Sequence, residues 1–229
     1  MKVKIKDLKS NPFRDMKSYP IDSSKVDVLI ASIKQTGFWD NILARKVGNK
    51  IEIAYGHHRL IALQKTMSDD DIVDIPVKPL DDATMLKVMA NENMDEWKTN
   101  PAIIDETVKA TKRFLEEHPK EAHKVGQIKS ASIEANFIGA LIIARFLGWE
   151  KTKVDRSLER IRMINEKIID PEAIKSLPTE GSARSFIKAV KQFKPTHDQQ
   201  KRVAQKISEM TKGERSEGAV RSLVTDEIY

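Results

Sequence analysis

One short passage of the chain combines small, basic and titratable residues at a predicted strand-to-helix boundary. It follows an apolar run at 51–55 and consists of Gly56, His57, His58 and Arg59. A glycine after a buried strand lets a ligand approach the backbone closely, and the N-terminus of a helix favours an anion. Arg59 would add a bidentate phosphate contact, and the histidines could bind phosphate oxygens or take part in acid–base chemistry. The passage is equally compatible with a phosphate site and with a plain turn that carries two surface histidines.

Carboxylate and amide side chains stand together at the end of a predicted helix that begins at Asp82. They are Asn91, Glu92 and Asn93. Their oxygens suit a hydrated Mg²⁺ ion shared with phosphates, which makes Glu92 a candidate metal ligand. Capping of the helix C-terminus by asparagine explains the same residues without any ligand. The adjacent histidines are a poor metal site, because neighbouring side chains cannot easily point at one ion.

Between residues 139 and 166, a short apolar helix is followed by a glycine-containing turn and a longer basic helix. This order is typical of a helix-turn-helix, whose second helix enters a major groove with its N-terminal end. The candidate DNA-binding residues on that second helix are Lys151, Thr152, Lys153, Arg156 and Arg160. An αα-hairpin without a DNA partner is the commoner case. The position of the basic residues, rather than their number, favours DNA.

The positive charge of the chain is confined to its second part. Residues 1–97 hold 15 basic and 15 acidic residues, whereas residues 98–229 hold 25 basic and 19 acidic residues, which is the whole net charge of +6. This asymmetry suggests a neutral domain joined to one that meets a polyanion. A solvated helical surface rich in lysine would give the same balance.

The composition excludes several classes of protein. Among 229 residues, 40% are hydrophobic, 6% are aromatic and none is cysteine. A chain without cysteine has no disulfide framework, no thiol nucleophile and no cysteine-ligated metal. No apolar stretch is long enough to span a membrane, and no apolar signal core follows Met1. We therefore expect a soluble cytoplasmic protein.

Strand and helix patterns alternate up to about residue 97, and only helical patterns follow. Strands are predicted at 2–8, 42–47, 51–55 and 75–79, with a hairpin turn at Gly48-Asn49. Early helices are predicted at 23–36, with an N-cap at 22–24 and a C-cap at Gly37, at 60–66 and from 82 onward. Later helices are predicted at 101–118, 132–147, 151–166, 171–177, 182–193, 198–210 and 216–224. The expected architecture is an α+β domain at 1–97, an all-α helix-turn-helix domain at 98–195, and C-terminal helices at 196–229 that could dimerise.

Six short motifs follow one another along the chain: Asn11-Pro12, Gly56-His57-His58-Arg59-Leu60-Ile61-Ala62, Ile75-Pro76-Val77, Asn91-Glu92-Asn93, Ile143-Ala144-Arg145-Phe146-Leu147-Gly148 and Glu180-Gly181-Ser182-Ala183-Arg184. Taken in order, they resemble the ParB family of partition proteins over about residues 1–195. The order of these weak motifs is more specific than any one of them.

The resemblance implies a ParB/sulfiredoxin-like domain that binds CTP or another nucleotide with Mg²⁺, followed by a domain that reads DNA. In that family, nucleotide binding closes a dimer into a sliding DNA clamp. Gly56 and Arg59 match the phosphate-binding box, and Glu92 and Asn93 match the metal and nucleotide box. His57 and His58 stand where the family usually has Glu and Arg.

The same resemblance implies a role in DNA partition or in the regulation of a mobile element. The protein would associate with a nucleoid or plasmid, would form a homodimer on double-stranded DNA, and could have a partner ATPase. Its own enzymatic activity would be at most a weak nucleoside triphosphatase.

Two alternatives belong to other classes. Gly-His-His-Arg is also found in free serine kinases of the same superfamily, which would make the chain a small-molecule kinase or phosphotransferase. Those kinases lack a helix-turn-helix. The other alternative is an interaction scaffold that binds no nucleotide. The sulfiredoxin branch is excluded, because its chemistry needs a cysteine.

Overall fold

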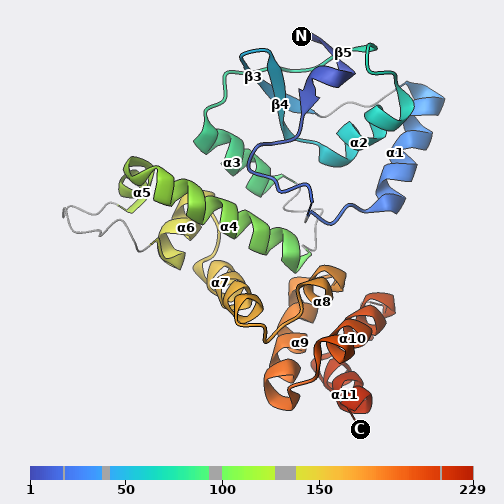
Figure 1. The fold of residues 1–229 in the computed structure, drawn as a ribbon, viewed down its shortest axis with the longest axis vertical. Helices are drawn as coiled ribbons and strands as arrows, with labels where there is room; N and C mark the ends of the chain where they lie inside the picture. Colours follow the sequence, from blue (N-terminus) through green and yellow to red (C-terminus); the bar gives the residue numbers. More distant parts are fainter. Residues whose placement is uncertain (18, 38–41, 93–99, 127–137, 212, 229) are drawn as a thin grey trace. The chain divides into compact units, whose positions relative to one another are not determined.

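The computed structural model describes residues 1–17, 19–37, 42–92, 100–126, 138–211 and 213–228. The chain forms two compact units, Met1–Glu92 and Asn93–Tyr229. The first unit mixes strands and helices, and the described part of the second is helical (Figure 1). The predicted order of an α+β part followed by an all-α part is confirmed. The finer division at residues 97 and 195 stays a prediction.

Two small sheets form the frame of the first unit. β1 (Lys2–Lys4) pairs antiparallel with β5 (Ile72–Asp74). In the second sheet, β4 (Lys50–Tyr55) lies between β3 (Leu43–Val47), to which it is antiparallel, and β2 (Leu8–Lys9), to which it is parallel. The hairpin predicted around residues 48–49 is confirmed, and the left-handed backbone it needs is supplied by Gly48 at φ 59°.

Two strand predictions need correction. The strand predicted at 2–8 is interrupted by a 3₁₀ turn, η1 (Ile5–Asp7), that separates β1 from β2. The strand predicted at 75–79 is wrong, since β5 ends at Asp74 and only an isolated bridge joins Val77 to Ala44. Pro76 and Pro79 have no N–H to donate to a ladder, which explains the short pairing.

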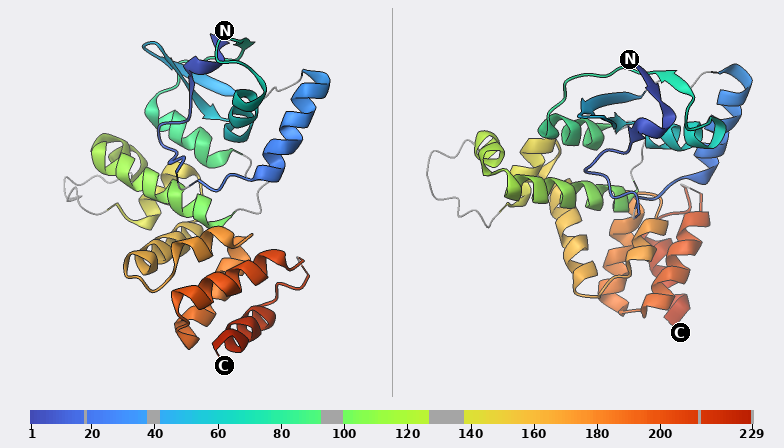
Figure 2. Two further views of the ribbon diagram at one scale, coloured as in Figure 1. Left: turned by 45° about the vertical axis from the view of Figure 1, so that its right-hand side comes forward. Right: turned by 45° about the horizontal axis from the view of Figure 1, so that its top comes forward.

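Three helices complete the first unit: α1 (Ser23–Thr36), α2 (His57–Thr66) and α3 (Asp82–Asn91). The α1 helix begins at an N-cap, where the Lys25 N–H donates to Asp22 Oδ1 at 3.1 Å, and it ends at Gly37 with φ 70°. Both ends follow the predicted caps. The α1 and α2 helices lie side by side (Figures 1 and 2), and α3 packs on β4. Their apolar faces enclose one core that includes Ile53, Leu60 and Leu63.

The described part of the second unit consists of helices α4 (Pro101–Glu117), α5 (Pro119–Gly126), α6 (Ala140–Leu147), α7 (Lys151–Asn165), α8 (Pro171–Ser176), α9 (Glu180–Phe193), α10 (His197–Glu209) and α11 (Glu217–Ile228). The sequence did not predict α5, which begins at Pro119, a residue that suits the first helical turn. The predicted helix at 132–147 begins only at Ala140 within the described residues, and 132–137 lie outside them.

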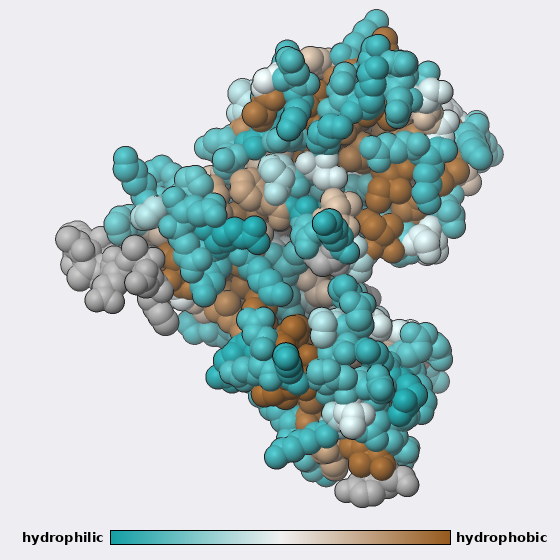
Figure 3. Space-filling view, in the orientation of Figure 1, coloured by the Kyte–Doolittle hydropathy of each residue, from teal (hydrophilic) through white to brown (hydrophobic). Residues whose placement is uncertain are grey.

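Packing in the second unit divides between two groups of helices. α4 packs against α5, α6, α7 and α8, while α10 packs against α8 and α11, and α9 packs against α11. The second group encloses an apolar core that includes Phe186, Val190 and Val203. The surface of the second unit visible in Figure 3 is mostly hydrophilic. Among the described helices, none has both the length and the hydropathy needed to cross a bilayer.

Candidate functional site

The predicted strand–glycine–helix passage is confirmed at the end of β4. Gly56 adopts φ 96°, in the left-handed region, and is the N-cap of α2. Its N–H donates to Glu92 Oε1 at 2.8 Å. The other N–H groups of the first helical turn have no partner within the helix. A carboxylate therefore lies where the backbone and the helix dipole favour negative charge.

The two histidines of the passage are buried, so the alternative of a plain turn with two surface histidines is wrong. His57 is 2% exposed and His58 is 8% exposed. The Asn11 N–H donates to His57 Nε2 at 3.4 Å, and the Asp22 N–H donates to His58 Nε2 at 3.2 Å. An Nε2 atom that accepts a hydrogen bond carries no proton, so Nδ1 is the protonated nitrogen of each neutral ring.

Burial also keeps both rings neutral. It lowers the pKa of His57 to about 3, with the charges of Arg14 and His58 acting in the same direction. Burial likewise lowers the pKa of His58, with Lys25 as the next cause. A neutral histidine whose Nε2 is already bonded to the backbone cannot act as an acid at that atom. The rings shape the passage and do not supply acid–base chemistry through Nε2.

The charges of three cations act on Glu92. Burial raises the pKa of Glu92, while the Gly56 N–H and the charges of Arg14, Arg59 and Lys25 act in the opposite direction. Its Oε2 atom lies 4.0 Å from His57 Nδ1. The N-terminus of α2 and the three cations thus favour negative charge at the same place, which is the arrangement expected of an anion site.

Arg14 and Lys25 were missed as site residues by the sequence analysis. Arg14 is 7% exposed, and its guanidinium lies 4.5 Å from the centroid of the Tyr19 ring. Both come from segments far from residue 56 in the sequence, and only the fold brings them to α2. Asn93, the other predicted residue of the metal and nucleotide box, lies outside the described residues. In the described part of the chain, no group of three acidic or histidine side chains could hold a metal ion.

We expect the first unit to lose stability as the pH falls from 7 to 5. The pKa of His57 is about 3 in the folded protein and 6.5 in the unfolded chain, so the unfolded state binds more protons between these values. The contribution of His57 to the free energy of unfolding is fully present above about pH 6.5 and declines as the pH falls toward 3. Between pH 7 and 5 this one residue accounts for a loss of about 2 kcal/mol. Urea denaturation of the full chain at both pH values measures the loss. His57→Gln keeps an acceptor but does not titrate, and an undiminished pH dependence in this variant would contradict the assignment.

The helix–turn–helix order predicted for the second unit is present in the structure. α6 is apolar and buries Ile143, Phe146 and Leu147. Gly148 ends it with φ 71°, in the left-handed region, and the Trp149 N–H donates to Ala144 O at 2.9 Å. α7 begins two residues later, so the chain reverses within a tight turn.

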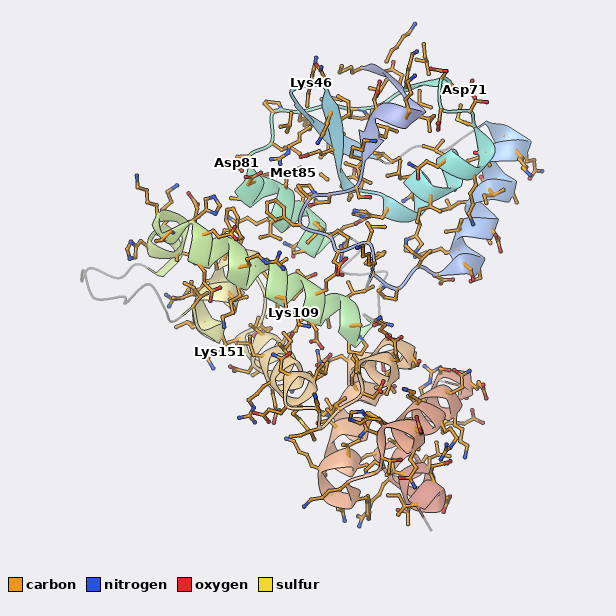
Figure 4. All side chains as sticks on the ribbon, in the orientation of Figure 1. Lys46, Asp71, Asp81, Met85, Lys109 and Lys151 are labelled. Carbon is orange, nitrogen blue, oxygen red and sulfur yellow. The ribbon has the colours of Figure 1, made fainter. Side chains whose placement is uncertain are left out.

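The five candidate DNA-binding residues of α7 have different environments. Lys151, Thr152 and Arg156 are exposed, and Lys151 lies at the start of the helix (Figure 4), where its Nζ is 2.7 Å from Asp155 Oδ2. Lys153 is half-buried, with Nζ 3.9 Å from the centroid of the Trp149 ring, and burial lowers its pKa. The first three are therefore the residues of this set that a ligand can reach most easily.

For Arg160, the fifth candidate, the structure corrects the prediction of a DNA contact. Its side chain is 1% exposed, and its Nη2 and Nη1 atoms lie 2.8 Å from Asp105 Oδ1 and 2.7 Å from Glu180 Oε1. A guanidinium bound in the interior in this way cannot reach a DNA groove. The sequence placed it on the surface because buried arginines are rare unless they are paired.

A cavity of about 180 Å³ lies between α7 and α9. It is lined mainly by charged residues, namely Arg156, Glu159, Arg160, Glu180, Arg184, Ile187, Lys188 and Lys191. Lys191 Nζ is 2.5 Å from Glu159 Oε1, and Lys188 pairs with Glu217. Arg156 and Arg184 are exposed. The sequence did not connect α9 with α7, because their cationic residues are separated by the whole of α8.

The first unit is thus a small α+β domain with a candidate anion site at a strand-to-helix boundary. The ParB N-terminal domain model matches residues 1–94 of the chain. No curated protein matches the sequence.

The chain is similar to two solved structures of the C-terminally truncated chromosome-partitioning protein ParB from Caulobacter crescentus. The one complexed with CTP-gamma-S shares 18% identity, with 100% of this chain and 98% of that chain covered and a TM-score of 0.36. The one complexed to the centromeric parS site shares 17% identity, with 90% of this chain and 99% of that chain covered and a TM-score of 0.41.

Proposed function

We propose that this chain is a ParB-like protein that binds duplex DNA through its second unit and acts in DNA partition. The observation that carries the proposal is the exposed start of α7, with Lys151, Thr152 and Arg156, beside a cavity rich in cations. Helix-turn-helix proteins insert the second helix in the major groove, and neighbouring cations bind phosphates. The match of the first unit to the ParB N-terminal domain supports the same function. A homodimer on a two-fold DNA site is part of the proposal.

The test is a titration of the full chain with fluorescent duplexes at several salt concentrations. The affinity should fall steeply between about 50 and 200 mM salt, because neutralised phosphates release counterions. Arg156→Ala should weaken binding about tenfold. It should also reduce the salt slope, which is the slope of log affinity against log salt concentration, by about one. Arg162→Ala is the matched control, since this side chain is 67% exposed on the same helix but does not line the cavity. Absence of salt-sensitive binding to any duplex would overturn the proposal.

We further propose that a nucleotide of the CTP type binds through its phosphates at the N-terminus of α2. Arg14, Lys25 and Arg59 supply positive charge there, and the helix N-terminus supplies N–H donors. The phosphate would compete with Glu92 for the Gly56 N–H, and Glu92 could then share a Mg²⁺ ion with the phosphate. The position of Glu92 among these cations fits both roles.

Calorimetry of the full chain with CTP, ATP and Mg²⁺ tests the nucleotide site. Arg59→Ala should weaken binding about tenfold, because a charge-assisted phosphate contact is lost. Lys65→Ala removes an exposed cation at the far end of the same helix and should leave binding unchanged. Absence of binding by any nucleoside triphosphate would favour the interaction scaffold. Phosphate transfer that depends on a small acceptor would favour the kinase.

A further inference from the structure

A network of four polar side chains, three of them buried, joins three helices of the second unit. Arg160 of α7 donates to Asp105 of α4 from Nε at 3.1 and 3.0 Å and from Nη2 at 2.8 Å. The same guanidinium donates from Nη1 to Glu180 Oε1 of α9 at 2.7 Å. Ser157 Oγ donates to Asp105 Oδ1 at 2.6 Å. We call Asp105, Ser157, Arg160 and Glu180 the Arg160 network.

The Arg160 network lies in an interior position where apolar side chains could also pack the helices together. Asp105 is 4% exposed, Ser157 is 0% exposed and Arg160 is 1% exposed. Val154 and Met163 are buried on the same helix and are apolar. Buried ion pairs are often no more stabilising than apolar residues of similar volume. Directional hydrogen bonds, however, permit fewer relative positions of the helices than apolar contacts do.

The network adjoins the cavity between α7 and α9 that Arg156 and Arg184 also line. Arg160 and Glu180 line the cavity between α7 and α9. Arg156 precedes Arg160 by one helical turn on α7, and Arg184 follows Glu180 by one turn on α9. The two exposed arginines at the cavity are therefore each one turn away from an end of the Arg160–Glu180 bridge.

We propose that Arg160 is a positioning residue that orients α7 against α4 and α9. The network holds Arg156 and Arg184 at a separation that lets both bind phosphates of one duplex. This inference rests on the DNA-binding function proposed above. It assigns a role to Arg160 that needs no contact with DNA.

The test uses a variant without the buried ion pair, Asp105→Leu combined with Arg160→Met. Spin labels at Arg162→Cys and Gln192→Cys report the distance between α7 and α9, and the chain has no native cysteine to interfere. The distance distribution should broaden in the double variant. The salt slope of DNA binding should fall by about one to two, because the phosphates are no longer contacted together. A role in stability alone would leave both measurements unchanged in the folded protein.

The matched control is Glu159→Leu combined with Lys191→Met. This ion pair joins the same two helices, but its side chains are 42% and 49% exposed, and the label distance should remain narrow. A double variant at 105 and 160 that keeps both a narrow distribution and the original slope would overturn the inference.

If that variant fails to fold, Arg160→Lys replaces it, since lysine cannot form the forked contact. If the unsubstituted chain binds no duplex, the DNA proposal fails, while the label distances still decide whether Arg160 positions α7.

Discussion

Replacing Asp105 by alanine should lower the free energy of unfolding of the second unit by about 3–5 kcal/mol, because the substitution leaves the buried Arg160 charge without its main partner. The Asp105 carboxylate accepts three hydrogen bonds from the guanidinium and one from the Ser157 hydroxyl, and the substitution removes all of them. Glu180 alone would then face Arg160. Hydrogen exchange in urea, followed on α4 and α7 in the full chain, measures the loss separately from the first unit.

An exposed ion pair on α7 provides the control for this prediction. Asp155→Ala removes the partner of Lys151, whose side chain is 56% exposed, and should cost less than about 1 kcal/mol. The double variant Asp105→Leu/Arg160→Met should also remain close to the original stability, because it leaves no uncompensated charge. Equal losses for Asp105→Ala and Asp155→Ala would show that the buried pair has no special importance.

Replacing Asn11 by aspartate should destabilise the first unit by about 2–4 kcal/mol, because a carboxylate would face two carbonyl oxygens in the interior. Asn11 is 1% exposed, and its Nδ2 donates to Ala54 O at 3.0 Å and Met85 O at 3.3 Å. Its Oδ1 accepts the Phe13 N–H at 2.9 Å. The side chain thus joins the segment before α1 to β4 and α3. Urea denaturation of the full chain, with hydrogen exchange on β4, measures the effect.

Asn49→Asp is the matched control, because Asn49 is exposed in the turn between β3 and β4. The same change of charge there should alter the free energy of unfolding by less than about 0.5 kcal/mol. A similar loss for both variants would mean that charge, rather than the lost donor, destabilises the unit.

Local patterns in the sequence predicted most of the elements that position the site. The strand, glycine and helix around Gly56, the caps of α1 and the hairpin at Gly48 all depend on residues close in sequence. Such features reflect backbone preferences and periodicity, which a single sequence displays. The strand predicted at 75–79 is wrong because Pro76 and Pro79 cannot donate to a ladder, so only an isolated bridge forms at Val77.

The burial and the neighbours of the side chains at the site could not be predicted from local sequence patterns. The sequence left open whether His57 and His58 lie at the surface, and the loop around Asn11 and the start of α1 at Asp22 bond to them in the interior. Arg14 and Lys25 join Arg59 around Glu92 only after the first unit has folded. No local spacing relates these residues to the glycine at 56.

Three features follow from the amino-acid sequence without knowledge of the fold: the order of an α+β part and a helical part, the glycine-capped start of α2, and the turn between α6 and α7. They depend on short-range propensities and on the alternation of apolar residues. Which charged residues face water depends instead on how the helices pack. Arg160 lies on the inward side of α7 because Asp105 and Glu180, which are 55 and 20 residues away in the sequence, neutralise it there. A buried charge depends on its partners in space, and that is why the basic helix of the sequence divides into exposed cations and one arginine that is bound in the interior.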